Sequence, residues 1–112
     1  MNLYVDVDDT LILWTFHKGL PNAKLIAAII KWRVEHPASD YIFIWSGGGA
    51  DYARGWCIKY LGQKLWNAVF DKYKQLNDGV FAPRVGDICI DDQQIKTDAI
   101  VMTPEKFIEF MA

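Results

Sequence analysis

The sequence predicts an α/β fold in which a five-stranded parallel sheet is doubly wound, with helices on both of its faces. Three observations favour this fold class. Short, continuously apolar runs recur along the 112 residues, and such runs suit strands buried on both faces of a parallel sheet. The segments between them show helical periodicity or turn residues. The resulting alternation of strand and helix implies parallel strands joined by right-handed crossovers.

The first strand is expected at about residues 2–6, and a loop follows it as far as Pro21. A helix is then predicted from about 22 to 35. Apolar residues recur along it at helical spacing, namely Leu25, Ile26, Ile29, Ile30 and Val34. Pro37 marks the end of this helix, because proline cannot continue a helix.

The second strand is expected at about 41–45 and leads into three glycines, Gly47 to Gly49. A helix at about 50–61 follows. Asp51 would lie in its first turn, where an acid interacts favourably with the positive end of the helix dipole. Gly62 stands where it would close this helix as a C-terminal cap.

A third strand is predicted at roughly 66–70. The stretch 71–86 is interpreted as mostly turn and loop. Asn77-Asp78-Gly79 and Pro83 are the reason, because these residue types favour turns and interrupt regular elements.

The fourth strand is expected at 87–91 and the fifth at 99–102. Thr103, Pro104 and Glu105 then have the order of N-cap, first-turn proline and first-turn acid with which a helix begins. No linker divides the chain, so we expect one Rossmann-like domain over residues 1–112 with no room for a second.

Composition excludes several classes of protein. The chain is 52% hydrophobic and 23% charged, an ordinary globular balance. Its net charge of -2 argues against tight non-specific binding to DNA or RNA, while a nucleotide or an oligonucleotide end remains open as a substrate. No apolar segment approaches the roughly 20 residues that span a bilayer, and no basic and apolar leader precedes the first strand. A cytoplasmic protein without a membrane partner is expected.

The two cysteines, Cys57 and Cys89, have no metal-ligand spacing. Cys89 lies inside an apolar strand, which predicts an inert core residue.

Acidic residues follow two of the predicted strands directly. Asp6 and Asp8 end the first strand, and Asp91 and Asp92 end the fourth. Ligands of open α/β sheets bind just outside the carboxyl ends of the strands, so these acids would meet if the two strands are neighbours. Crowded carboxylates repel one another unless a cation neutralises them, and oxygen-only ligands favour Mg²⁺ over zinc. The alternative is that they are solvated strand-end or capping residues.

Ser46 followed by three glycines is a second signal. Glycine lets the backbone approach an anion closely, and the start of the next helix supplies N–H donors. The Ser46 hydroxyl would add one more donor to a phosphate oxygen. The alternative is an ordinary glycine-rich turn.

These residues resemble the motifs of a known family, in the same order and with the expected alternation of strand and helix. Asp6-Val7-Asp8-Asp9-Thr10-Leu11 resembles the first motif, DxDx[TV]L, of the haloacid dehalogenase-like (HAD) hydrolases. Ser46 resembles their second motif, and Asp91-Asp92 resembles their fourth. The resemblance spans nearly the whole chain and implies a small HAD-like domain without a cap domain. Asp9 stands where the family often has glycine.

The resemblance implies a role for each of these residues. Asp6 would be the nucleophile that forms an aspartyl-phosphate, and Asp8 would be the general acid and base. Asp6, the backbone carbonyl of Asp8, and Asp91 would hold Mg²⁺, with Asp92 binding it directly or through water. Ser46 and the Gly47 amide would hold phosphate oxygens. Asp8 favours phosphate ester chemistry over carbon–halogen cleavage, because family members that protonate no alkoxide often replace it.

The family's third motif, a Lys or Arg that steadies the nucleophile and phosphate, has no single match. Lys64, Lys72, Lys74 and Arg84 are the candidates, and position favours Lys74. Each of them, taken alone, is interpreted as a solvated surface cation. Asp87 could fit a variant of the fourth motif, but it is expected to begin a strand.

A domain without a cap would have an open site, which suits a large substrate or one covered by another subunit. Trp14 and Phe16 could stack on a nucleobase, or they could pack on the body of the domain. Trp32, Trp56 and Trp66 are expected in the core or between helices, and any that is exposed would favour an oligomer interface.

The sequence thus predicts a Mg²⁺-dependent phosphatase that cleaves phosphomonoesters, including those of nucleotides or macromolecules. Two other classes are weighed. One is a catalytically silent metal-binding or regulatory domain of the same fold. The other is a phospho-acceptor receiver domain, in which Asp71 would carry the phosphoryl group, but that class has its acid pair after the first strand.

Overall fold

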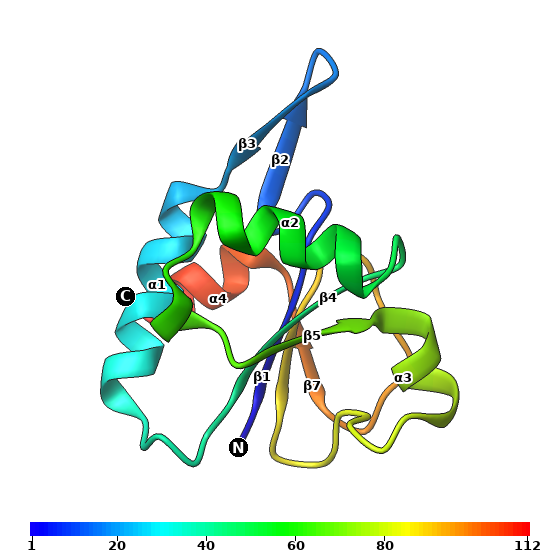
Figure 1. The fold of residues 1–112 in the computed structure, drawn as a ribbon. Coiled ribbons are helices and arrows are strands. Elements are labelled where there is room, and N and C mark those ends of the chain that lie inside the picture. The colour runs from blue at the N-terminus through cyan, green and yellow to red at the C-terminus, as the bar shows by residue number, and fades with distance from the viewer.

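A five-stranded, all-parallel sheet runs through the molecule, which is described over residues 1–112 by a computed structural model (Figure 1). The strand order is β5-β4-β1-β6-β7, with β1 at the centre. The strands are β1 (Leu3–Asp6), β4 (Ile42–Ser46), β5 (Ala68–Asp71), β6 (Ile88–Ile90) and β7 (Ile100–Met102). This confirms the predicted α/β fold class and its five parallel strands.

The helices between the strands are α1 (Ala23–Glu35), α2 (Ala50–Tyr60), α3 (Lys72–Asp78) and α4 (Pro104–Phe110), with a short 3-10 helix at Gln63–Leu65. The predicted N-cap of α4 is confirmed, because Oγ1 of Thr103 accepts a hydrogen bond from Lys106 N at 3.2 Å. The predicted cap at Gly62 is wrong. Its φ of −68° is not the left-handed conformation, and α2 ends at Leu61 with extended backbone.

The two faces of the sheet are covered differently. Leu3 and Val5 point to the face on which α1, α2 and α4 pack, and they belong to the larger hydrophobic cluster. Tyr4 and Cys89 point to the other face, where a smaller cluster meets Leu76 of α3. Side chains of successive strand residues alternate in this way, so continuously apolar strands can fill both cores.

The three tryptophans expected in the core or between helices, and Cys89, pack in the interior or against it. Trp32 is fully buried on α1, and Trp56 and Trp66 are half-buried against the larger cluster. Cys57 and Cys89 are free and buried, and burial raises the pKa of each thiol to about 12. Cys89 is therefore an inert core residue, as predicted.

The segment after β1, predicted as a loop, forms a β-hairpin of β2 (Ile12–Thr15) and β3 (Lys18–Pro21). The hairpin projects beyond the body of the molecule in Figure 1. Its two-residue turn is Phe16-His17, with φ of 50° and 64°. Both central residues of the favoured hairpin turn need positive φ, which is usually supplied by Asn-Gly or similar pairs. The turn therefore carries none of the usual sequence signature.

A third correction concerns residues 71–86, which were predicted as mostly turn and loop. Residues 72–78 form α3, and only the remainder is irregular. Oδ1 of Asp71 caps the helix by accepting a hydrogen bond from Lys74 N at 3.1 Å. The helix begins immediately after β5, so its first residue lies at the carboxyl edge of the sheet.

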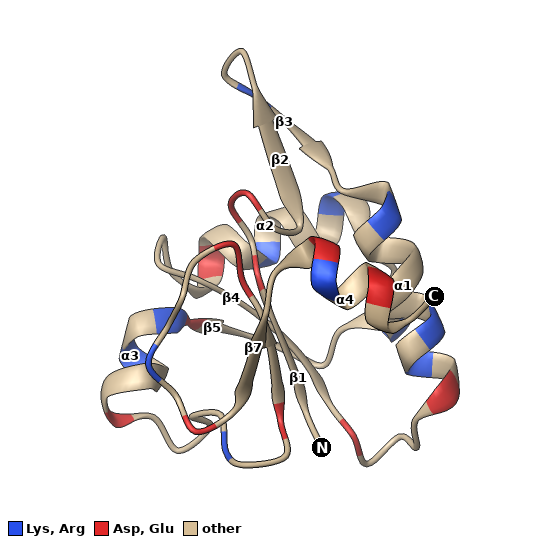
Figure 2. Cartoon of the chain, turned by 180° about the vertical axis from the view of Figure 1, so that it is seen from behind, with Lys and Arg blue, Asp and Glu red and all other residues tan.

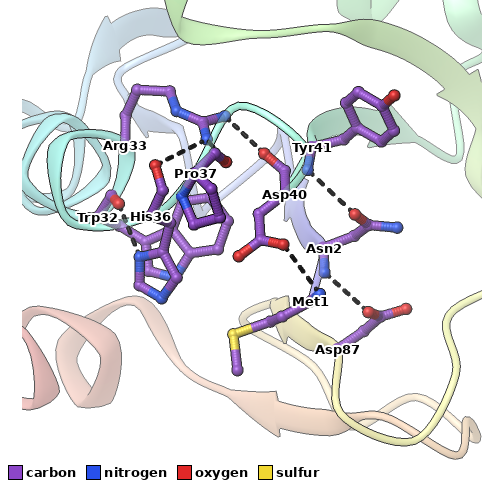
Figure 3. Close-up of polar contacts among 9 residues, drawn as sticks. All are labelled: Met1, Asn2, Trp32, Arg33, His36, Pro37, Asp40, Tyr41 and Asp87. Atoms are coloured by element: carbon purple, nitrogen blue, oxygen red, sulfur yellow. Dashed lines mark hydrogen bonds and ion pairs between the residues drawn. The ribbon is translucent and has the colours of Figure 1, made fainter.

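The amino edge of the sheet, at the opposite end, is closed by polar contacts (Figure 3). Asn2 N donates to Oδ1 of Asp87 at 2.8 Å, and Tyr41 N donates to Oδ1 of Asn2 at 3.0 Å. The terminal ammonium of Met1 lies 3.2 Å from Oδ1 of Asp40. Asp87 directly precedes β6 at this edge, one residue before the observed start of the strand, and it does not join the acids at the other edge.

None of the helices combines the length and the hydropathy that crossing a bilayer requires.

Candidate functional site

The carboxyl ends of three neighbouring strands bring Asp6, Ser46 and Asp91 to one edge of the sheet. β1 pairs with β4 on one side and with β6 on the other, in parallel register. A hollow of about 300 Å³ lies over this edge. It is lined by Asp6, Asp8, Asp9, Ser46, Gly47, Gly48, Lys72, Tyr73, Asp92 and Gln93. Figure 2 shows acidic loop segments gathered at this end of the sheet, towards the hairpin.

Three carboxylates form a compact cluster at the centre of this edge. One oxygen each of Asp6, Asp91 and Asp92 lie within 4.8 Å of one another. Asp6 and Asp91 are buried, at 6% and 1% exposure, whereas Asp92 is exposed. The cluster forms because Val5 and Ile90 are paired across β1 and β6, so the acids that follow them are neighbours. The structure thus brings together three of the four acids that were expected to meet, and the Asp8 carboxylate is not part of the cluster.

Lys72 supplies the positive charge of the site. Its Nζ lies 2.6 Å from Oδ2 of Asp91 and 3.3 Å from Oδ1 of Asp6, and its side chain is buried. Burial by itself would lower the pKa of Lys72, but the contacts with Asp91 and Asp6 outweigh burial and raise it. Lys72 therefore stays charged and neutralises part of the cluster.

The preferred candidate from the sequence, Lys74, lies elsewhere. Lys74 is exposed on α3 and does not line the hollow, and Lys64 is also exposed. Arg84 lies at the amino edge of the sheet, in the hollow that contains Asn2 and Asp87. Of the four candidates, only Lys72 reaches the acids.

One cation does not balance the cluster. Burial, and next the charge of Asp91, raise the pKa of Asp6 from 3.8 to about 7, although Lys72 acts in the opposite direction. Burial and Asp91 also raise the pKa of Asp92. Asp6 and Asp92 are therefore held in a site that disfavours their negative charge.

Thr10 joins the two acidic loops. Its Oγ1 donates to Oδ2 of Asp6 at 3.3 Å and accepts from Asp92 N at 3.1 Å. The side chain is fully buried. Thr10 belongs to the first motif, but no separate role was predicted for it; its place in that motif was the available signal.

The glycines after β4 lie beneath two tyrosines. A Cβ at Gly47 would lie 2.6 Å from Cε2 of Tyr73, and one at Gly48 would lie 3.1 Å from Cδ2 of Tyr52. Oγ of Ser46 accepts a hydrogen bond from Gly48 N at 3.0 Å, which fixes the loop. Because Gly47 and Gly48 have no side chains, the two tyrosine rings can pack closely on them. The backbone of the glycines also stays accessible at the hollow.

Asp8 and Asp9 lie on the turn after β1. Oδ1 of Asp8 accepts hydrogen bonds from Trp14 Nε1 at 2.9 Å and from Tyr52 Oη at 2.6 Å. Asp9 has a φ of 58°, a left-handed conformation that glycine adopts readily and that aspartate tolerates better than most residues. This conformation explains why glycine would also suit this position.

The donor set fits a small divalent cation. It consists only of oxygens, as Mg²⁺ prefers. Oδ2 of Asp91 is buried and has no hydrogen bond of regular geometry, even though Lys72 Nζ approaches it as an ion pair. One ammonium donor occupies at most one lone pair of a carboxylate oxygen, so the other lone pair of Oδ2 remains free. A cation beside Asp6, Asp91 and Asp92 would use it and would neutralise the remaining charge.

Comparison of the chain with models of protein families, with curated proteins and with solved structures finds no match. The description of the fold and of the acidic cluster therefore rests on the structure itself.

Proposed function

We propose that this protein is a Mg²⁺-dependent phosphohydrolase that cleaves phosphomonoesters through an aspartyl-phosphate on Asp6. The observation that carries the proposal is the position of Lys72, whose ammonium lies between Asp6 and Asp91 at the floor of the hollow. A lysine in this place fills the one role that the resemblance to HAD hydrolases left unassigned.

In the first step, a carboxylate oxygen of Asp6 attacks phosphorus and the bond from phosphorus to the ester oxygen breaks. Asp8 gives its proton to that oxygen, so the product leaves as an alcohol. Lys72 holds Asp6 in place by its contact with Oδ1, which leaves Oδ2 of Asp6, beside Thr10, as the attacking oxygen.

In the second step, water attacks the aspartyl-phosphate and gives a proton to Asp8. The bond between phosphorus and Asp6 breaks, so inorganic phosphate leaves and both carboxyl groups return to their starting states. Ser46 and the Gly47 amide, which line the hollow beside Asp6, would bind the phosphate oxygens in both steps.

Asp6, Asp91 and Asp92, with the backbone carbonyl of Asp8, would hold the magnesium ion. When bound, Mg²⁺ would neutralise charge on the phosphoryl group that is transferred. The raised pKa of Asp6 supports this assignment, because a nearby cation is what would keep a buried nucleophile ionised at neutral pH.

The test is a phosphoester panel with and without Mg²⁺, covering nucleotides, sugar phosphates, phosphopeptides and oligonucleotide ends. Asp6→Asn should abolish turnover. Asp51→Asn is the matched control, because the Asp51 side chain is fully exposed on α2 and pairs with Arg54. Full metal-dependent activity in Asp6→Asn would refute the proposal.

One observation favours a second candidate, a catalytically silent metal-binding or regulatory domain. Lys72 alone satisfies part of the acidic cluster, as a purely structural ion pair would. Binding of Mg²⁺ by the purified protein, without turnover of any member of the panel, would support this candidate over the phosphatase.

A further inference from the structure

Two aromatic donors from separate elements converge on one oxygen of Asp8. Trp14 Nε1, on β2 of the hairpin, donates to Oδ1 at 2.9 Å, and Tyr52 Oη, on α2, donates to the same atom at 2.6 Å. A carboxylate oxygen has two lone pairs in the carboxyl plane, so these two donors fill the acceptor capacity of Oδ1.

The donors are themselves held by packing. The rings of Trp14 and Trp56 meet edge to face at 5.7 Å, and those of Tyr52 and Trp56 do so at 6.4 Å. Trp56 on α2 thus fixes the orientation of both donors. Side chains that rotate freely on a surface would have no such fixed orientation.

Two glycines make room for this arrangement. Gly19, opposite Trp14 in the hairpin, has no side chain, and a Cβ there would lie 2.8 Å from Cη2 of Trp56 and 3.2 Å from Cη2 of Trp14. Gly48 allows the ring of Tyr52 to lie close over the loop after β4. The hairpin and the glycine loop therefore leave room for the rings whose polar atoms contact Asp8.

We propose that Trp14 and Tyr52 are positioning residues that hold Oδ1 of Asp8, leaving Oδ2 to exchange a proton with the substrate. The inference rests on the proposed function, in which Asp8 protonates the leaving oxygen. Half-exposed hydrogen bonds with no such role are common on protein surfaces. Here, however, both donors contact the acid that the proposed chemistry uses as its proton donor, and both rings pack on the same tryptophan.

The leaving group distinguishes positioning of a general acid from general damage to the site. An alkyl phosphate releases a basic alkoxide that needs the proton, whereas 2,4-dinitrophenyl phosphate releases a stable anion that does not. We expect Tyr52→Phe and Trp14→Phe to lower kcat/KM for an alkyl phosphate by roughly 5- to 50-fold. For the dinitrophenyl ester, kcat/KM should fall by less than about threefold on the same reasoning.

Two substitutions serve as matched controls. Tyr60→Phe removes a hydroxyl from the same helix, and Trp66→Phe removes an indole N–H that lacks a partner, with neither residue lining the hollow. Both should leave kcat/KM unchanged for both esters. Equal losses for the two esters in Tyr52→Phe and Trp14→Phe, or no loss in either, would overturn the proposal.

A measurement without turnover tests the contact itself. In ¹⁵N-labelled protein, the indole N–H signal of Trp14, assigned by its disappearance in Trp14→Phe, should shift and exchange faster with water in Asp8→Ala. An unchanged signal would overturn the proposal whatever the activity. If the signal responds as expected but the wild-type protein cleaves no phosphoester, the proposed function fails and the contact stands.

Discussion

Nζ of Lys72 lies 2.6 Å from Oδ2 of Asp91, and both side chains are buried. This pair links the start of α3 to the end of β6 and brings a cation against the acidic cluster. Removing one partner of a buried ion pair leaves an uncompensated charge. The stability lost in this way is larger than the net stability that the intact pair contributes.

Lys72→Met should therefore destabilise the metal-free protein by about 3–5 kcal/mol at neutral pH. The free energy of unfolding in urea, measured with EDTA present, checks this. Lys74→Met is the matched control, because the Lys74 side chain is exposed on the same helix, and it should change stability by less than about 0.5 kcal/mol. Equal effects of the two substitutions would contradict the buried ion pair.

The stability of the metal-free protein should depend on pH through Asp6, whose pKa is raised from 3.8 to about 7. The folded protein keeps a proton on Asp6 that the unfolded chain has released, so this contribution is complete below about pH 4 and is lost as the pH rises through about 7. Asp6→Asn should exceed the wild-type protein in stability by roughly 1–3 kcal/mol at pH 8, because it mimics the neutral form.

Urea unfolding of both proteins in EDTA, from about pH 4.5 to pH 8, measures this difference. The stability of Asp6→Asn relative to the wild-type protein should increase with pH. A difference that stays constant, or that decreases as the pH rises, would show that Asp6 is not held in a site that disfavours its charge.

Thr10 should couple the two acidic loops, because its hydroxyl bonds both Asp6 and the backbone of Asp92. Thr10→Val keeps the shape but loses both hydrogen bonds, so it should destabilise the protein by about 1–3 kcal/mol and weaken Mg²⁺ binding. Thr10→Ser should retain most of both. Unfolding and calorimetric titration with Mg²⁺ give the two readouts, and a Val variant that binds Mg²⁺ as the wild-type protein does would argue against the coupling.

Two glycines, one at the N-cap of α2 and one inside the helix, should respond in opposite ways to replacement by alanine. Gly49, at the N-cap, has a φ of 104°, so Gly49→Ala should destabilise the protein by about 1–2 kcal/mol. Gly55 lies inside the helix with nothing within 4 Å of an added Cβ, so Gly55→Ala should stabilise the protein by about 0.5–1 kcal/mol. Thermal unfolding of the two variants checks both signs, and a shift of the same sign in both would contradict the geometry of α2.

The sequence predicted the sheet well because buried parallel strands leave a strong apolar signal. Each predicted strand lies within two residues of the observed one. The hairpin was missed because its turn, Phe16-His17, has positive φ without glycine or asparagine. Only contacts outside the turn, such as that between Trp14 and Trp56, can favour this conformation over a loop.

The sequence predicted where the acids of the site lie, but it did not predict which cation lies beside them. Acids at strand ends are located by the strands themselves. The position of Lys72 depends on α3, which has only seven residues and is followed by turn residues, so that its periodicity is too short to recognise. The N-cap at Asp71 was the available signal, since it begins the helix immediately after β5 and places the next residue at the site. Tyr52 left no signal, because its contact with Asp8 depends on how α2 packs.

Asp71, the acceptor that a receiver domain would need, caps α3 through Oδ1. The competing functions differ in the carboxyl group that accepts a phosphoryl group. A phosphatase would use Asp6, a receiver domain would use Asp71, and a catalytically silent domain would use neither. Borohydride reduces an aspartyl-phosphate to homoserine, which marks the modified position in the chain.

The most direct measurement is mass spectrometry of peptides from protein that has turned over a phosphoester with Mg²⁺ and has then been quenched with acid and reduced with borohydride. The proposed mechanism predicts homoserine at position 6, dependent on Mg²⁺ and on substrate. Homoserine at position 71, or at no position while phosphate is released, would contradict it.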